Sequence, residues 1–317
     1  MDAAAPAGGD GLSWATAYTE LQQAFADAEN DESITAIWVA EGTYSPDAGT
    51  GDPTAEFLLL GQENLDVLGG FPSGGADLDG RNPSVYETVL TGDLNSDDTT
   101  SVNRLLFDTN SNPLNTTSAR IAYRNIDDNS RTVLGISGSL PSLVIDGFTL
   151  RGGHDPDRGG AIMAANASAT LRNLRIESCS GGLEGGAVFF TDPAEPVLLE
   201  NCTFVRNSAP GLGGAVLVAR GSLRLVDCEF NENFAGFGGA VSSVNPQGPS
   251  SVEIEGGVYT GNTAVDATNV NGEGGAVYTS DGYTLNIRDA VFADNRAEWF
   301  GGGVRAFSFI SFVDSVF

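Results

Sequence analysis

The sequence contains no lysine, one histidine and three cysteines among its 317 residues. All 15 basic residues are therefore arginines, and 42 aspartates and glutamates bring the formal net charge to −27 at pH 7. A surface with this excess of negative charge repels phosphate backbones, so no nucleic acid partner is expected. Three cysteines are too few for a disulfide framework in a chain of this length.

Long apolar runs are also missing, so no membrane span is expected in this chain. Residues 1–10, MDAAAPAGGD, have neither a basic start nor an apolar segment. They do not form a signal peptide and are predicted to be a disordered leader.

Glycine, in contrast, is abundant, with 42 residues. A Gly-Gly-Ala or Gly-Gly-Gly motif recurs at steps of 26, 28, 25, 36 and 27 residues, at Gly159–Ala161, Gly185–Ala187, Gly213–Ala215, Gly238–Ala240, Gly274–Ala276 and Gly301–Gly303. A motif repeated at such a period is typical of stacked-repeat proteins, in which each coil packs on its neighbours.

Apolar anchor residues recur between these motifs, usually with asparagine three positions later. The anchors are Leu150, Ile176, Phe204, Phe230, Tyr259, Phe292 and Phe317, and the asparagines are Asn207, Asn233, Asn262 and Asn295. The residues five and seven positions before each anchor are apolar, and most residues between them are polar, an alternation typical of a strand. We expect the asparagines to build corners in the left-handed conformation and to bond to one another in a ladder.

The coils are too short for helical crossovers, and like residues recur in register, so equivalent strands should stack in parallel about 4.8 Å apart. The sequence thus predicts an all-β fold, a right-handed parallel β-helix (solenoid) with two or three short strands in each coil. Regular coils of 25–36 residues are expected over residues 143–317. The chain stops within a coil at Phe317, so we expect a part of a longer protein.

The N-terminal third is less regular. Tyr18, Leu21, Phe25 and Ala28 share a helical spacing, so residues 16–30 are predicted to form a short helix that caps the open end of the β-helix. Residues 93–131 are rich in Asp, Asn, Ser and Thr and should leave the coil as a long excursion. Residues 11–142 are thus expected to hold the cap helix and irregular first coils, with strands at Ile34–Val39, Phe57–Leu60, Leu65–Leu68, Val89–Leu90, Leu105–Phe107 and Thr132–Ile136.

Gly-Gly-Ala-Ile/Val together with Phe-x-x-Asn resembles the repeats of the polymorphic outer-membrane protein family. The segments GLSWATAYTELQQAF and LVIDGFTLRGG resemble large secreted bacterial β-helix proteins. The resemblance is good over residues 11–44 and 143–317 and loose over 45–142. It implies an extracellular location at the bacterial cell surface and an adhesive or structural role.

Polysaccharide-cleaving enzymes also use β-helices, so the fold alone does not decide the function. Such enzymes need clustered carboxylates, and Glu253 and Glu255 are the best candidates, about 7 Å apart on one strand, a separation near that of glycosidase pairs. Arg224 and Arg288 should lie beside them on neighbouring coils. This arrangement favours ion pairing between coils over a catalytic role.

The stretch DLNSDD, residues 93–98, begins like a calcium loop, with Asp93, Asn95 and Asp97 as oxygen ligands. Asp98 stands where an EF-hand has glycine, so an EF-hand is excluded. The loop either binds calcium or is simply a solvated loop. No cofactor other than calcium is expected. His154, the single histidine, has no second His or Cys at ligand spacing, so no metal role is expected for it.

One outward column lies just after the glycine motifs and is partly apolar, with Met163, Phe189, Leu217 and Tyr278 as the candidate contact residues and Ser242 and Arg305 after the other two motifs. The small third residues of the motifs are expected to flank it and to flatten this face. Either a loop or the 93–131 excursion covers the column, or it forms a contact face for another chain or a glycan.

Taken together, the sequence favours a non-catalytic extracellular module with a structural, filament-forming or adhesive role over an enzyme. The alternative is a polysaccharide-binding or polysaccharide-degrading β-helix passenger. The expected partners are surface glycans or further copies of the chain, which would stack on the open end of the coil.

Overall fold

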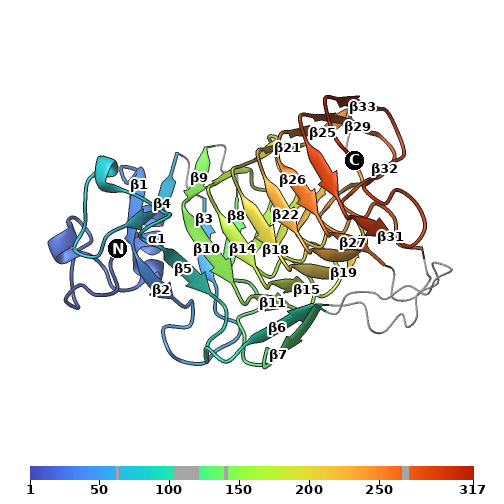
Figure 1. The fold of residues 1–317 in the computed structure, drawn as a ribbon. Coiled ribbons are helices and arrows are strands. Elements are labelled where there is room, and N and C mark those ends of the chain that lie inside the picture. Colours follow the sequence, from blue (N-terminus) through green and yellow to red (C-terminus); the bar gives the residue numbers. More distant parts are fainter. Residues whose placement is uncertain (62–63, 103–120, 139–141, 247, 266–270) are drawn as a thin grey trace.

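The computed structural model describes residues 1–61, 64–102, 121–138, 142–246, 248–265 and 271–317. These residues wind into a parallel β-helix, in which successive coils lie side by side along one axis (Figure 1). The predicted all-β, parallel β-helical fold is confirmed. Each complete coil passes through four sheets, numbered 1 to 4 in chain order, so it has four strands rather than the two or three expected.

The strands of each sheet follow one another in chain order. Sheet 1 contains β1 (Ala36–Ala40), β4 (Asp66–Phe71), β9 (Leu143–Asp146), β13 (Ala169–Arg172), β17 (Val197–Glu200), β21 (Leu223–Val226), β25 (Ser250–Glu255), β29 (Tyr283–Arg288) and β33 (Ile310–Val313). Sheet 2 contains β2 (Gly42–Tyr44), β5 (Thr88–Thr91), β10 (Phe148–Arg151), β14 (Arg175–Glu177), β18 (Thr203–Val205), β22 (Glu229–Asn231), β26 (Val258–Thr260) and β30 (Val291–Ala293).

Sheet 3 has the fewest strands of the four, and the sequence does not predict it. It contains β11 (His154–Asp155), β15 (Ser180–Gly181), β19 (Ser208–Leu212), β23 (Phe234–Phe237), β27 (Thr263–Ala264) and β31 (Arg296–Ala297). Sheet 4 contains β3 (Phe57–Leu60), β8 (Leu134–Ser137), β12 (Ile162–Ala165), β16 (Val188–Thr191), β20 (Val216–Ala219), β24 (Val241–Val244), β28 (Val277–Thr279) and β32 (Val304–Ala306).

The interior is built from like residues stacked on like. Phe204 pairs with Phe230 in sheet 2, and Leu225 pairs with Ile254 in sheet 1, as the periodicity predicts. The anchor rings stack with centroid separations of 4.8, 4.9, 4.5 and 4.9 Å, in the order Phe204, Phe230, Tyr259, Phe292 and Phe317. These separations match the spacing of strands in a sheet, so each ring covers the ring of the preceding coil.

The glycine motif has a steric cause at each position. Gly213 has a φ of 63°, in the left-handed region that glycine adopts without a steric penalty. A Cβ on Gly214 would lie 2.1 Å from the carbonyl oxygen of Gly239, so only glycine fits where adjacent coils approach. Ala215 is fully buried in the main core, and the other motif alanines are as well. The prediction that the motif alanines face outward is therefore wrong.

The N-terminal end is closed by α1 (Leu21–Asn30), which follows the short 3-10 helix η1 (Trp14–Thr16). Leu21, Ala24, Phe25 and Ala28 form its buried face. The Phe25 ring meets that of Phe57 edge-on, 6.5 Å between centroids, and the helix joins the main core. The helix is shorter than the predicted 16–30. No helix within the described residues is long and apolar enough to cross a membrane.

Residues 1–10 do not form a disordered leader. Met1 and Asp2 are buried. The amino group of Met1 donates to the carbonyl oxygen of Trp38 at 2.8 Å, and the N–H of Ala40 donates to that of Met1 at 2.9 Å. The start of the chain therefore pairs with the outer edge of β1 and satisfies backbone groups that would otherwise stay open.

The first coils contain the predicted strands, Phe57–Leu60 with the predicted bounds and the others with shifted ends, and Leu105–Phe107 lies outside the described residues. A second short 3-10 helix, η2 (Leu78–Gly80), lies between β4 and β5. The predicted excursion holds an antiparallel hairpin, β6 (Thr99–Val102) and β7 (Ile121–Arg124), inserted between β5 and β8. Tyr123 Oη lies 3.1 Å from the carbonyl oxygen of Cys179 and 2.9 Å from that of Arg206. The hairpin therefore lies along sheet 3 (Figure 1).

Candidate functional site

The predicted carboxylate pair lies on the outer face of β25, on either side of the buried Ile254. Glu255 Oε2 is 3.0 Å from Arg224 Nη2 and 3.1 Å from Arg288 Nη2. Glu253 Oε2 is 3.9 Å from Arg224 Nε. Sheet 1 thus brings all four residues together, and its parallel register joins them into ion pairs across three coils.

The two arginines keep Glu255 ionised. The hydrogen bond from Arg224 and the charge of Arg288 lower the pKa of Glu255 below its ordinary value. A general acid in glycoside cleavage needs a raised pKa, which requires the opposite surroundings. The geometry suits ion pairing between coils, and exposed pairs of this kind contribute little to stability.

The asparagine column forms a hydrogen-bonded ladder. Asn233 Oδ1 accepts from the backbone N–H of Asn207 at 3.0 Å and from its Nδ2 at 3.2 Å. Asn233 Nδ2 donates to the carbonyl oxygen of Phe204 at 3.1 Å. The same bonds continue through Asn262 to Asn295. Because Asn207, Asn233 and Asn262 are buried, these amides satisfy backbone groups inside the corner.

The left-handed backbone at this corner lies one residue earlier than predicted. Arg206 and Glu232, which precede two ladder asparagines, both have a φ of 54°, whereas the ladder asparagines have no positive φ. The correction has a simple cause: an amide that bonds to the coils above and below must point inward, and the residue before it turns the chain.

The predicted contact face is closed at its centre. Phe189 and Leu217 are 2% and 0% exposed, and only Met163 and Tyr278 stay partly exposed. The four side chains belong to a small second core on the outer side of sheet 4, together with Leu212, Ala219 and Val244. Two of the four predicted contact residues are therefore unavailable to a partner.

The cover of this second core comes from the end of a sheet 3 strand, β23, and from the segment that links β11 in sheet 3 to β12 in sheet 4. The guanidinium carbon of Arg158 lies 5.3 Å from the centroid of the Phe189 ring. The Phe237 ring lies 5.3 Å from that of Tyr278. These neighbouring segments, rather than the 93–131 excursion, supply the contacts described here, and the described hairpin of the excursion lies along sheet 3.

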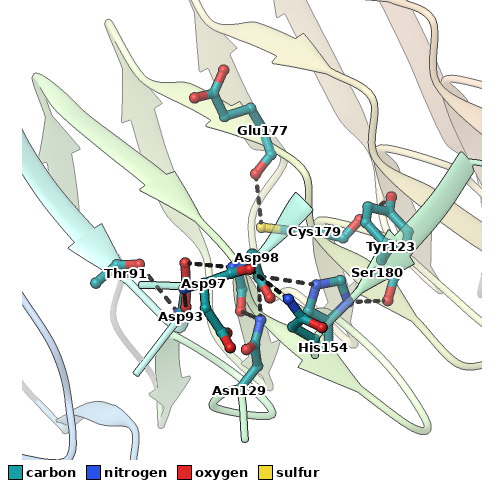
Figure 2. A network of polar contacts seen from close by, with 12 residues as sticks. Thr91, Asp93, Asp97, Asp98, Tyr123, Asn129, His154, Glu177, Cys179 and Ser180 are labelled. Atoms are coloured by element: carbon teal, nitrogen blue, oxygen red, sulfur yellow. Dashed lines mark hydrogen bonds and ion pairs between the residues drawn. The ribbon is translucent and has the colours of Figure 1, made fainter. Parts of the chain in front are cut away.

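An acidic loop follows β5 and leads into β6. Asp93 Oδ1 accepts from the N–H of Asp97 at 3.1 Å, and its Oδ2 accepts from the N–H of Asp98 at 3.4 Å. Thr91 Oγ1 accepts from the N–H of Asp93 at 3.2 Å. The fold of this loop gathers the carboxylates of Asp93, Asp97 and Asp98, each with an oxygen within 4.8 Å of the others (Figure 2).

Two side chains from distant parts of the chain complete this cluster. Asn129 Nδ2 donates to Asp98 Oδ2 at 2.6 Å and to the carbonyl oxygen of Gly152 at 2.7 Å. His154, in β11, lies beside Asp98, with 3.9 Å between Nε2 and Asp98 Oδ2. Its Nδ1 is 2.6 Å from Ser180 Oγ in the next coil. Figure 2 shows the imidazole and the amide on neighbouring sides of Asp98.

Burial shifts both titratable groups at this contact. Burial raises the pKa of Asp98 to about 6, against the hydrogen bond from Asn129, and the nearby carboxylates add to the rise. Burial lowers the pKa of His154 to about 4, so the imidazole is neutral at neutral pH.

The structure changes the membership of the predicted loop site. Asp93 and Asp97 belong to the cluster, whereas Asn95 is exposed and Asp98 occupies the buried side. The sequence predicts no metal role for His154, because no second His or Cys lies at ligand spacing. His154 reaches Asp98 only because β11 packs beside the inserted segment, and no local sequence motif predicts that contact.

Comparison with curated proteins finds a relative that matches part of the chain. The chain is 36% identical over 136 residues to a probable autotransporter, YfaL, of Escherichia coli (strain K12), and the match covers 39% of this chain. The chain spans 10% of the length of that curated relative. No family model and no solved structure matches. The resemblance to the polymorphic outer-membrane protein family thus stays a prediction.

Proposed function

We propose that the chain is an extracellular passenger module of the bacterial cell surface, with a structural or adhesive role rather than a catalytic one. The partial similarity to a probable autotransporter supports secretion or surface display. The acidic, lysine-free composition is in keeping with a solvent-exposed surface.

The observation that carries the proposal is the unbroken stacking of the coils. Sheet 1 alone joins nine parallel strands of the described chain, with a register shift in its first pair, β1 and β4. The aromatic stack and the asparagine ladder run inside the same coils, so each coil is held by its neighbours through apolar contacts and buried hydrogen bonds. Such a solenoid is an elongated body that presents its faces along its length, which suits a stalk or an adhesive surface.

The outer carboxylates support a non-catalytic role. Glu255 is the most favourably placed candidate for acid–base chemistry, and two arginines neutralise it and lower its pKa. The partners that we propose are glycans of a cell surface or further copies of the chain.

The test uses a panel of acidic and neutral polysaccharides with the purified chain, with and without calcium. Product release, retention on each polysaccharide and the mass in solution from light scattering are recorded. We expect no product release, with retention on a glycan for an adhesive role or growth of mass with concentration for a filament. A monomer of constant mass that no polysaccharide retains would contradict both of these roles.

The enzymatic alternative has its own discriminating variant. If products are released and Glu255→Gln abolishes the release, the non-catalytic proposal is wrong. Glu200→Gln is the matched control, because Glu200 is another partly exposed glutamate of sheet 1, whose Oε2 lies 4.0 Å from Arg172 Nε.

A further inference from the structure

The acidic cluster has buried polar atoms without a partner. His154 is 5% exposed in its side chain, and its Nε2 has no hydrogen bond. Asn129 is 3% exposed, and its Oδ1 is also without a partner, as is Oδ1 of Asp98. Buried polar atoms in folded proteins are almost always satisfied, so three such atoms in one cluster, Asp98 Oδ1 itself among them, point to a bound ligand.

The kind of ligand follows from the chemistry of these atoms. Asn129 Oδ1 and the carboxylate oxygens are acceptors only. Asn129 Nδ2 is already used on Asp98 and Gly152, which fixes the amide with its oxygen free. If Nδ1 of His154 donates to Ser180 Oγ, Nε2 presents a lone pair. A group surrounded by acceptors and lone pairs must be a cation or a strong donor.

The charge leads to the same conclusion. Asp93, Asp97 and Asp98 place three carboxylates in one small volume. Elsewhere on the described surface, acidic residues such as Glu232 and Asp192 pair with arginines, but no arginine of the described chain forms an ion pair with the cluster. The repulsion among these carboxylates is relieved when a divalent ion is shared between them.

We propose that Asp93, Asp97, Asp98 and His154 bind a divalent transition-metal ion such as Zn²⁺ or Mn²⁺. The imidazole separates this site from a calcium site, because Ca²⁺ takes oxygen ligands whereas imidazole suits transition metals. Two ligand atoms bound to one ion at about 2.1 Å lie about 3 to 4 Å apart. The 3.9 Å between His154 Nε2 and Asp98 Oδ2 falls within that range.

The ion would join two parts of the fold. Asp93, Asp97 and Asp98 belong to the insertion that follows β5, and His154 belongs to β11, the first strand of sheet 3. The N–H of His154 donates to the carbonyl oxygen of Ser130 at 3.0 Å, so the insertion already contacts this strand. Metal binding would fasten the insertion to the edge of sheet 3, independently of any surface role of the module.

The single histidine makes the proposal directly testable. The chain, prepared without a polyhistidine tag and stripped with chelator, is labelled with ¹⁵N, and its one imidazole is followed by NMR during titration with ZnCl₂, MnCl₂ and CaCl₂. We expect one equivalent of Zn²⁺ to shift the Nε2 resonance and Mn²⁺ to broaden it, whereas Ca²⁺ leaves it in place.

Two variants locate the carboxylate side of the site. Asp97 is exposed, so Asp97→Asn should fold normally and weaken Zn²⁺ binding by about tenfold or more in calorimetry. Asp157→Asn removes the same charge from an exposed aspartate outside the cluster and should leave the affinity unchanged.

The outcomes divide cleanly. Zn²⁺ binding that moves the imidazole and weakens in Asp97→Asn supports the site. No binding of either metal overturns it. So does binding that leaves the imidazole resonance unmoved, which would place any ion on oxygen ligands alone.

Discussion

The same position of the coil carries different chemistry in the regular coils and in the first coils. Three residues after Phe204, Phe230, Tyr259 and Phe292, the chain has the ladder asparagines. Three residues after Leu90, which lies in the same sheet, it has Asp93. Asn233 turns inward and bonds to the coils on either side, whereas Asp93 accepts the N–H groups of its own loop.

The difference follows from the number of residues that separate paired strands along the chain. In the regular part, Leu143 pairs with Ala169, 26 residues later. In the first coils, Asp66 pairs with Val144, 78 residues later, and the insertion with the acidic cluster accounts for most of the difference. In a regular repeat, the buried polar groups form hydrogen bonds with equivalent residues of the adjacent coils. An insertion has no copy beside it, so its polar groups are left for other partners.

The largest expected effect lies in the aromatic stack. Phe230 is fully buried between the rings of Phe204 and Tyr259, so Phe230→Ala should lower the free energy of unfolding by about 3–5 kcal/mol. Denaturant unfolding followed by circular dichroism measures it. The exposed Leu183→Ala is the control. Leu90 occupies the same anchor column of sheet 2 but has no aromatic ring. If Phe230→Ala lowers the free energy of unfolding by no more than Leu90→Ala does, ring stacking does not distinguish the regular coils from the first coils.

The asparagine ladder comes next. Asn233→Ala removes the acceptor of two donors of Asn207 and a donor to Phe204, which leaves buried groups unpaired. We expect a loss of about 3 kcal/mol, measured in the same way. Asn231→Ala changes the same residue type two positions earlier, at a partly exposed site, and should cost little. Equal losses for the two variants would argue against the ladder.

A smaller and local effect is expected where the insertion meets the coils. Tyr123→Phe removes a hydroxyl group that lies within hydrogen-bond distance of the carbonyl oxygens of Cys179 and Arg206. The free energy that protects the amides of β6 and β7 from hydrogen exchange should fall by about 1 kcal/mol, whereas the amides of the regular coils should be unchanged. Amide hydrogen exchange measures the hairpin and the regular coils in one experiment. Faster exchange throughout the β-helix would mean that the insertion supports the whole fold.

The smallest effect is expected on the outer face. The pKa of Glu255 is lowered in the folded chain, so its contribution to stability is present above the ordinary value and is lost as the pH falls through the folded value. Because the ion pairs are exposed, Glu255→Gln should shift the thermal midpoint only slightly at pH 7, and the shift should shrink further as the pH falls below the ordinary pKa of a glutamate. Glu200→Gln again serves as the control, and a large shift at pH 7 would contradict the exposed ion-pair description.

The parts of the fold that repeat could be predicted from the sequence. Phe204 and Phe230 recur at a fixed step and pair as predicted, and Arg224, Glu255 and Arg288 meet because sheet 1 keeps its register. Period and alternation carry this information, since each copy repeats the same surroundings.

The remaining features depend on contacts that no period encodes. Sheet 3 is too narrow to show alternation, with only two residues in β11 and β15. The inward direction of Ala215 depends on the turn made by the preceding glycines. His154 reaches Asp98 only because an insertion folds back on the first strand of sheet 3, and both residues look unremarkable within their own segments.

The match between Phe204 and Phe230 bears on how such a gene changes length. The two residues occupy equivalent places in adjacent coils, 26 residues apart. Loss of residues 205–230 would join Phe204 to Asn231 and leave every remaining strand facing an equivalent partner. Unequal crossing-over between the coding repeats would therefore add or remove one whole coil in frame. Descendants of one ancestral sequence can differ in length by whole coils while keeping the same interior.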